Sequence, residues 1–279
     1  MRYDTGYESS NVEDRRGSGG GGGLPIGKLG IGGTLIVGVL SLIFGRNLFT
    51  SSPSGRSTRG PDPADEEARH FVAFVLDDAQ SVWKDVLPSQ AHARYRDAKL
   101  VLFDDPIETA CGDAESAIGP FYCPGDEKVY IDLGFYAELR DRLGAPGQFA
   151  QAYVIAHELG HHVQNLLGTE KRMRGLQRGK STTEKNELSV RLELQADCYA
   201  GIWARSTQDR SLLERGDVES AMGAAAAVGD DRLQKAARGT VNPEKFTHGS
   251  SASRVRWFNA GFDSGQLDAC DTFAPNARL

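Results

Sequence analysis

The chain has 279 residues and a formal net charge of −6, with 39% hydrophobic and 25% charged residues. These values are ordinary for a globular protein of one or two domains. The acidic balance lacks the basic footprint that nucleic-acid binding requires, so we expect no nucleic-acid partner.

The first 28 residues have a composition that disfavours folding. They carry as many acidic as basic side chains and include a run of glycines, Gly19–Gly23. A low-complexity stretch of this kind cannot bury a core. We predict a disordered, glycine-rich tail over residues 1–28.

An apolar segment follows the tail. Between Lys28 and Arg46 lie 17 uncharged residues, which as a helix span about 26 Å, the short end of a transmembrane segment. Snorkelling of Arg46 extends the span to Phe49. No cleavage pattern of a signal peptide follows. A buried core helix is also disfavoured, because the sequences on both sides of the segment have a composition typical of disorder. We predict an uncleaved transmembrane anchor over residues 29–49; the basic residues near it, three on each side, leave its orientation undecided.

Residues 50–61 read as a linker rich in Ser, Pro, Gly and Arg, and a folded domain follows over 62–279. Asp62 is a plausible N-cap, with Pro63 at the first helical position. The first helix is predicted from an apolar stripe at helical spacing, formed by Phe71, Val72, Val75, Leu76, Ala79, Val82, Trp83 and Val86.

Two segments after this helix have strand character, Lys99–Phe103 and Lys128–Leu133. A strand along an active cleft can pair with an extended substrate by edge addition, although an ordinary sheet strand is an equal reading for Lys99–Phe103. His70 and His92 are predicted to be structural or solvated.

The segment Gln148–Leu167 is apolar, helix-patterned and contains His157-Glu158-Leu159-Gly160-His161. In a helix, residues four apart lie on one face, so both imidazoles can reach one metal ion. Glu158 can then act on a water bound to that metal. This spacing predicts a zinc site with His157 and His161 as ligands and Glu158 as general base.

A third ligand is expected in the next helical stretch, Glu184–Arg205. Glu193 and Asp197 share a face there, and apolar residues surround them. We assign Glu193 as the metal ligand and Asp197 as the acceptor that orients a ligand histidine, with the reverse assignment left open.

Two further helices complete the chain. Asp217–Arg238 is predicted as one helix, rich in alanine near its middle. Ser250 or Ser251 is expected to cap a last helix that runs through Phe258.

The chain has four cysteines, Cys111, Cys123, Cys198 and Cys270. An even number suits two disulfides in an oxidising compartment, with Cys111 paired to Cys123 and Cys198 to Cys270. Four reduced cysteines are the alternative, whereas a cysteine zinc site is disfavoured because no C-x-x-C spacing occurs. The disulfides favour a domain on the outer side of the cytoplasmic membrane.

These motifs together resemble the bacterial neutral zinc metallopeptidase family, whose members are membrane-anchored with a gluzincin-type site. The resemblance covers nearly the whole chain and is carried by eight segments: Asn11–Gly17, Cys111–Gly112, Gly119–Pro124, Val129–Leu133, His157–Gln164, Glu193–Gly201, His248–Ser251 and Arg254–Phe258. It implies metallopeptidase activity and names no substrate.

The resemblance also gives a role to His248, six residues before Arg254. This spacing is similar to the His…Arg motif of other membrane-associated gluzincins, although Gly249 stands where many have proline. A positioned His248 can donate to the oxyanion of the reaction, and Arg254 can pair with a site carboxylate. A solvated loop histidine is the alternative reading.

We therefore predict an α+β, mostly helical, zincin-like metallopeptidase domain that binds one Zn²⁺ per chain and hydrolyses a peptide or protein substrate. Residues 29–49 would hold it at the membrane. Two alternatives remain open: a catalytically inactive zincin fold that serves as a tethered scaffold, and a zinc amidase that acts on cell-wall peptides.

Overall fold

The computed structural model describes residues 1–17, 63–104, 106–114 and 119–279. In these ranges the protein is mostly helical with a small sheet, as predicted for the fold class. The strands are β1 (Val12–Asp14), β2 (Lys99–Leu102), β3 (Ile107–Thr109), β4 (Gly112–Ala114), β5 (Phe121–Cys123) and β6 (Lys128–Ile131). The helices are α2 (Pro63–Ala91), α3 (Gly134–Asp141), α4 (Gln148–Leu166), α5 (Thr169–Leu176), α6 (Thr182–Asp209), α7 (Asp217–Ala227), α8 (Asp230–Arg238) and α9 (Ser251–Ser264), with 3₁₀ turns η3 (Pro243–Lys245) and η4 (Leu267–Cys270).

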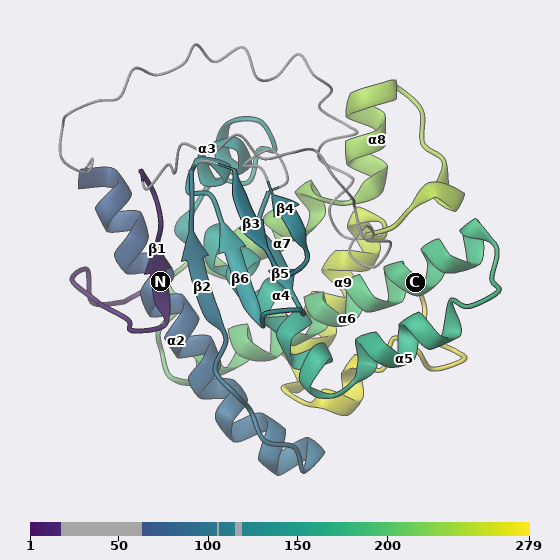
Figure 1. Ribbon diagram of the computed structural model, residues 1–279, viewed down its shortest axis with the longest axis horizontal. Coiled ribbons are helices and arrows are strands. Elements are labelled where there is room, and N and C mark those ends of the chain that lie inside the picture. Colours follow the sequence, from purple (N-terminus) through teal and green to yellow (C-terminus); the bar gives the residue numbers. More distant parts are fainter. Residues whose placement is uncertain (18–62, 105, 115–118) are drawn as a thin grey trace.

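The main sheet has the order β1-β2-β6-β5. Strands β1, β2 and β6 are parallel, with Val12 opposite Leu100 and Leu100 opposite Val129, whereas β5 runs antiparallel to β6. Both predicted strands are present as β2 and β6. Figure 1 shows the sheet and α2 on one side of the molecule, α5, α6 and α9 on the other, and α4 between them.

Helices α4 and α6, which carry the two predicted motifs, cross closely. A side chain on Gly160 would meet the backbone of Ala196 at 3.0 Å, so the glycine inside the histidine motif lets the two helices approach. The predicted stripe of α2 is also confirmed, because Phe71, Leu76 and Trp83 are among its fully buried side chains.

The predicted helix over Asp217–Arg238 is wrong as a single element, because the chain breaks between α7 and α8. Gly229 stands at the break, and a Cβ there would lie 2.4 Å from the backbone nitrogen of Ser251. The start of α9 therefore packs directly against the break, where a side chain larger than glycine would not fit. The break also places Asp230 at the first position of α8.

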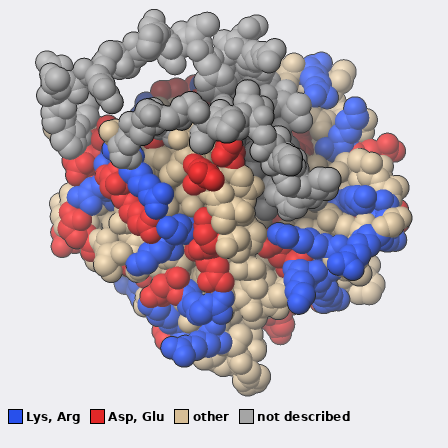
Figure 2. Space-filling view, in the orientation of Figure 1, with Lys and Arg blue, Asp and Glu red and all other residues tan. Residues whose placement is uncertain are grey.

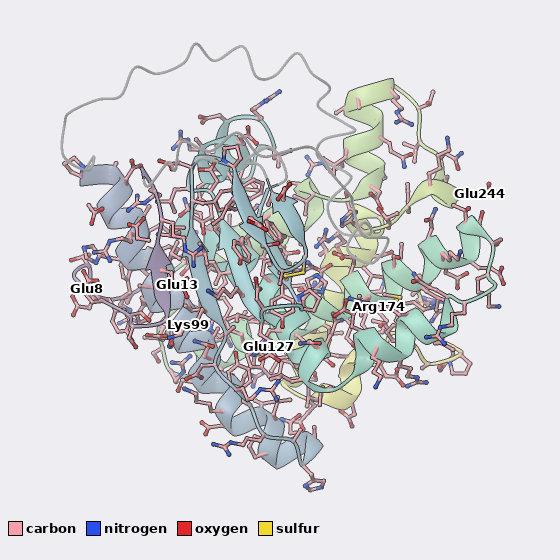
Figure 3. All side chains as sticks on the ribbon, in the orientation of Figure 1. Glu8, Glu13, Lys99, Glu127, Arg174 and Glu244 are labelled. Atoms are coloured by element: carbon pink, nitrogen blue, oxygen red, sulfur yellow. A yellow bond between two sulfur atoms is a disulfide. The ribbon has the colours of Figure 1, made fainter. Side chains whose placement is uncertain are left out.

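The prediction of a disordered tail is wrong for residues 1–17. Met1 is buried, its amine lies 3.0 Å from the Asp217 carboxylate, and β1 joins the sheet. The side chains that suggested disorder form ion pairs with the domain, such as Glu8–Arg69 and Glu13–Lys128. Figures 2 and 3 show this mixed-charge face around β1, with Glu8 and Glu13 labelled in the second view.

The predicted anchor over 29–49 and the linker over 50–61 lie outside the described residues. Among the described helices, none is both long and apolar enough to cross a membrane.

Both predicted disulfides are present. Cys111–Cys123 joins the turn of the β3–β4 hairpin to the end of β5, and Cys198–Cys270 joins α6 to η4. The second bridge fixes the C-terminal segment against the helix that carries Glu193.

Candidate metal centre

Three of the predicted ligands lie together in the structure. His157 and His161 come from one face of α4, and Glu193 comes from α6; all three are buried. The Glu193 carboxylate is 3.3 Å from His157 Nε2 and 3.5 Å from His161 Nε2. A tetrahedral zinc ion with ligand bonds of about 2.0–2.1 Å separates its ligand atoms by about 3.4 Å, so these spacings fit zinc.

The other ring nitrogen of each histidine is engaged. His157 Nδ1 lies 2.9 Å from Asp197 Oδ1, and His161 Nδ1 lies 2.8 Å from Gln164 Oε1. The Asp197 carboxylate can only accept. Gln164 Oε1 also accepts, because the amide nitrogen of the same side chain donates to the Leu192 carbonyl. Each Nδ1 therefore carries the proton, which leaves both Nε2 lone pairs free for a metal.

The two carboxylates of α6 have different surroundings. Glu193 faces both Nε2 atoms, whereas Asp197 lies behind His157 on the Nδ1 side. This geometry favours the assignment of Glu193 as ligand and Asp197 as the orienting acceptor. Burial opposes the charge on Glu193, but His161, His248 and His157 hold the pKa of its carboxyl below the usual value.

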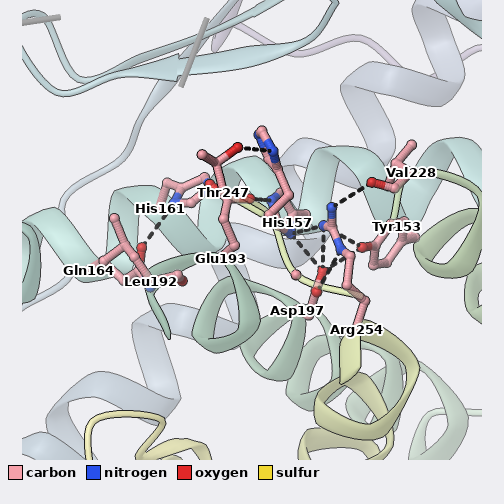
Figure 4. Close-up of polar contacts among 12 residues, drawn as sticks. Tyr153, His157, His161, Gln164, Leu192, Glu193, Asp197, Val228, Thr247 and Arg254 are labelled. Carbon is pink, nitrogen blue, oxygen red and sulfur yellow. Dashed lines mark hydrogen bonds and ion pairs between the residues drawn. The ribbon is translucent and has the colours of Figure 1, made fainter. Parts of the chain in front are cut away.

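Asp197 belongs to a buried charged network, drawn in Figure 4. Arg254 donates to both Asp197 oxygens at 2.9 Å, and the Tyr153 hydroxyl donates to the same carboxylate. Burial alone would raise the pKa of Asp197, but Arg254 and His157 lower it. The predicted partnership of Arg254 with a site carboxylate is present. Tyr153 was missed, although its place one turn before His157 put it on the same face of α4.

Glu158 is buried on α4. Its Oε2 atom has no hydrogen-bond partner among the described residues, while the Tyr122 backbone hydrogen-bonds the carboxylate. Burial raises the pKa of Glu158, which makes it a better proton acceptor than a solvated glutamate. An unpaired buried oxygen is costly, so Oε2 is open to a partner that the described residues do not supply.

His248 is held beside the cluster by Asp230. Asp230 Oδ2 accepts from three consecutive backbone N–H groups, those of Thr247, His248 and Gly249. Its Oδ1 lies 3.5 Å from His248 Nδ1. Burial opposes the imidazolium, but Glu193 and Asp230 raise the pKa of His248. Sequence reasoning missed Asp230, because it was placed in the interior of one continuous helix.

The sheet edge beside α4 is β5, which has only β6 as a neighbour among the described strands. Neither predicted strand is at an edge, since β2 and β6 each have partners on both sides; the expectation of edge addition on either strand is therefore wrong. The Tyr122 hydroxyl of β5 lies 3.0 Å from His162 Nδ1 and accepts from the Asn165 amide. These buried contacts fix β5 against α4.

The remaining three histidines lie outside the metal cluster. His162 Nε2 donates to the Arg96 carbonyl at 2.7 Å, and burial lowers the pKa of His162. His70 Nδ1 contacts the Tyr7 carbonyl at 2.9 Å, which confirms its structural reading. His92 is exposed at the end of α2. None of the three lies in the metal cluster.

Two buried imidazoles with free Nε2 atoms and one carboxylate can hold a zinc ion, and Glu158 follows the first of these imidazoles in α4. Comparison with known proteins agrees: the family model described as "Putative neutral zinc metallopeptidase" matches residues 1–273. The chain belongs to this family.

Two relatives illustrate the match. "Uncharacterized protein YpfJ" of Escherichia coli (strain K12) is 47% identical over 98% of this chain and 99% of its own length. "Uncharacterized protein Rv2575" of Mycobacterium tuberculosis (strain ATCC 25618 / H37Rv) is 43% identical over 73% of this chain and 70% of its own. No solved structure matches the chain significantly.

Proposed function

We propose that this protein is a zinc-dependent peptidase with a zincin-like domain. The proposal rests on one observation: the chain has both a three-ligand cluster and, next to it in α4, a Glu158 Oε2 atom without a hydrogen-bond partner among the described residues. Sites that only store or structure zinc close the fourth position with another protein ligand, and no fourth ligand of this kind joins the cluster among the described residues.

His157, His161 and Glu193 would hold a Zn²⁺ ion, which would polarise the scissile carbonyl and lower the pKa of a bound water toward about 7. Glu158 takes the proton of the attacking water at Oε2 and then delivers it to the leaving amine. Its raised pKa suits both roles, because it must accept and release a proton near neutral pH.

His248 and Arg254 support this chemistry from two directions. His248, held by Asp230, donates to the carbonyl oxygen of the substrate as that oxygen gains negative charge. Arg254 acts at a distance, since it holds the Asp197 carboxylate that fixes the His157 ring.

The substrate is a peptide or protein segment in extended form. The edge of β5 that no described strand covers is near α4, so an added strand would run beside the metal cluster with its amides in a fixed register.

Residues 29–49 are proposed to attach the protein to the cytoplasmic membrane, with the catalytic domain on the outer, oxidising side. The two disulfides support that side. A single crossing would separate Met1–Gly17 from the rest of the domain, whereas β1 pairs with β2. We therefore propose that both flanks of residues 29–49 lie on the same side, in place of the single-pass arrangement predicted from sequence.

The test is zinc content together with cleavage by the full chain. The full chain is needed because β1 is part of the sheet. We expect one zinc per chain and chelator-sensitive cleavage in a peptide library. Bound zinc without any cleavage would favour the scaffold alternative, and cleavage confined to cell-wall peptides would favour the amidase.

A further inference from the structure

A groove of about 390 Å³ lies between the N-terminal half of α6 and the segment that joins η3 to α9. Val190 lines it from α6, and Phe246 and Gly249 line it from the connecting segment. None of these residues belongs to the metal cluster, so the groove needs its own explanation.

Two observations place this groove beside the metal centre. Val190 precedes Glu193 by three residues, which is about 4.5 Å along α6 and on a neighbouring part of the same face. Gly249, which follows His248 in the chain, packs against Val190 and Leu194, and Leu194 is the residue after Glu193 in α6. The groove therefore begins on the His248 side of the cluster.

The backbone fixes the shape of this groove. Gly249 has a φ of +92°, and a Cβ there would meet Val190 at 3.3 Å and Leu194 at 3.2 Å. Any larger residue would be strained and would push the segment away from α6. On the other side of the groove, the Asn186 amide donates to the Glu244 carbonyl at 2.9 Å. Contacts within the protein thus fix the two walls of the groove relative to each other.

The chemistry of the groove is mainly apolar. Val190, Pro243, Phe246 and Leu279 supply aliphatic and aromatic surface. The polar residues that line the groove are Thr183, Asn186, Glu187, Glu244, Ser250 and Ser253. Binding at a concave apolar site is most favourable for a ligand side chain that covers this apolar surface and removes it from water. Its volume suits one large side chain better than a folded partner.

We propose that this groove is a substrate subsite that selects a bulky apolar residue, such as leucine or phenylalanine, next to the scissile peptide bond. The inference rests on the proposed peptidase activity and adds a substrate class to it. Val190 and Phe246 are its specificity-determining residues.

The experiment compares zinc-loaded full-length protein with three variants. Val190→Trp fills the groove, Phe246→Ala enlarges it, and Gln208→Trp adds the same bulk at an exposed position of α6 as a matched control. Each is assayed on a peptide library and then on paired peptides with phenylalanine or alanine at the selected position. We expect Val190→Trp to lower the phenylalanine-to-alanine ratio of kcat/KM about 10-fold or more, a size typical of hydrophobic pockets. Phe246→Ala should shift the preference toward tryptophan, and Gln208→Trp should leave the ratio unchanged.

The outcomes separate the two proposals. Glu158-dependent cleavage with no apolar preference, or a preference that both groove variants retain with normal zinc content, would overturn the subsite alone. If the zinc-loaded wild type cleaves nothing, the peptidase proposal fails and the subsite fails with it. Zinc content shows whether each variant has folded, and Phe246→Ala decides the matter should Val190→Trp be unstable.

Discussion

Single atoms determine which residues can hold the metal. His157 and His161 offer Nε2 because Asp197 and Gln164 occupy Nδ1, and of the two α6 carboxylates Glu193 is the one that faces both Nε2 atoms. Glu193 and Asp197 offer the same ligand chemistry, so the ring nitrogen that each carboxylate faces decides which one is the ligand and which one orients His157.

The assignment predicts different zinc losses for the two carboxylates. Glu193→Ala should lose most of its zinc, because it removes a ligand. Asp197→Asn should bind zinc about 10–100-fold more weakly, because it removes only the charged acceptor on His157. Elemental analysis and chelator competition measure both. Full zinc in Glu193→Ala with loss in the Asp197 variant would reverse the assignment.

The general base gives a second prediction. Glu158→Gln should keep zinc and fold but abolish peptide hydrolysis, because an amide cannot accept the proton of water at neutral pH. His248→Ala should be milder, with a loss of about 10²–10³-fold in kcat. A chelator-sensitive library digest is the measurement. Wild-type activity in Glu158→Gln would remove the proposed mechanism.

Elements decide how these atoms meet. Gly160 lets α4 approach α6, the break at Gly229 frees Asp230 to hold the His248 segment, and β1 closes one edge of the sheet. The N-terminal segment is therefore part of the domain, although the glycine run and the apolar segment separate it from α2 in sequence.

Deletion of residues 2–17 should destabilise the domain. The deletion exposes the β2 edge and removes contacts such as the edge-to-face packing of Tyr3 on Phe71, a kind of contact that contributes about 0.5–1.5 kcal/mol. Urea unfolding of full-length and truncated protein in the same detergent gives the difference. Deletion of Gly19–Gly23 is the control and should change the free energy of unfolding little. Equal stability of the wild type and the 2–17 deletion would show that β1 pairing is dispensable.

At the scale of the whole molecule, the sheet constrains topology. Residues 1–17 pair with β2 and form ion pairs with the rest of the described domain. The proposed arrangement, with both flanks of residues 29–49 on the same side, follows from this pairing.

Cysteine labelling tests this topology. All four native cysteines are in disulfides, so Thr5→Cys and Gln208→Cys each introduce a single exposed thiol. In intact spheroplasts, a membrane-impermeant maleimide should modify both positions, because the proposed topology puts both on the outer side. Labelling of position 208 with protection of position 5, reversed by lysis, would restore the single crossing. Protection of both would keep the unit whole but place it inside.

The sequence by itself determined the features that depend on local spacing. The shared face of His157 and His161, the position of Glu158 beside them and the carboxylates of the next helix follow from helix periodicity. The even number of cysteines favoured two disulfides, and the structure shows both predicted pairs. Only the tertiary structure decided what depends on long-range packing: the direction each carboxylate faces, the buried roles of Tyr153, Asp230 and His162, the edge position of β5, and the return of Met1–Gly17 to the sheet. Composition could not reveal that return, because charges that look solvated along the chain find their partners on elements more than 60 residues away.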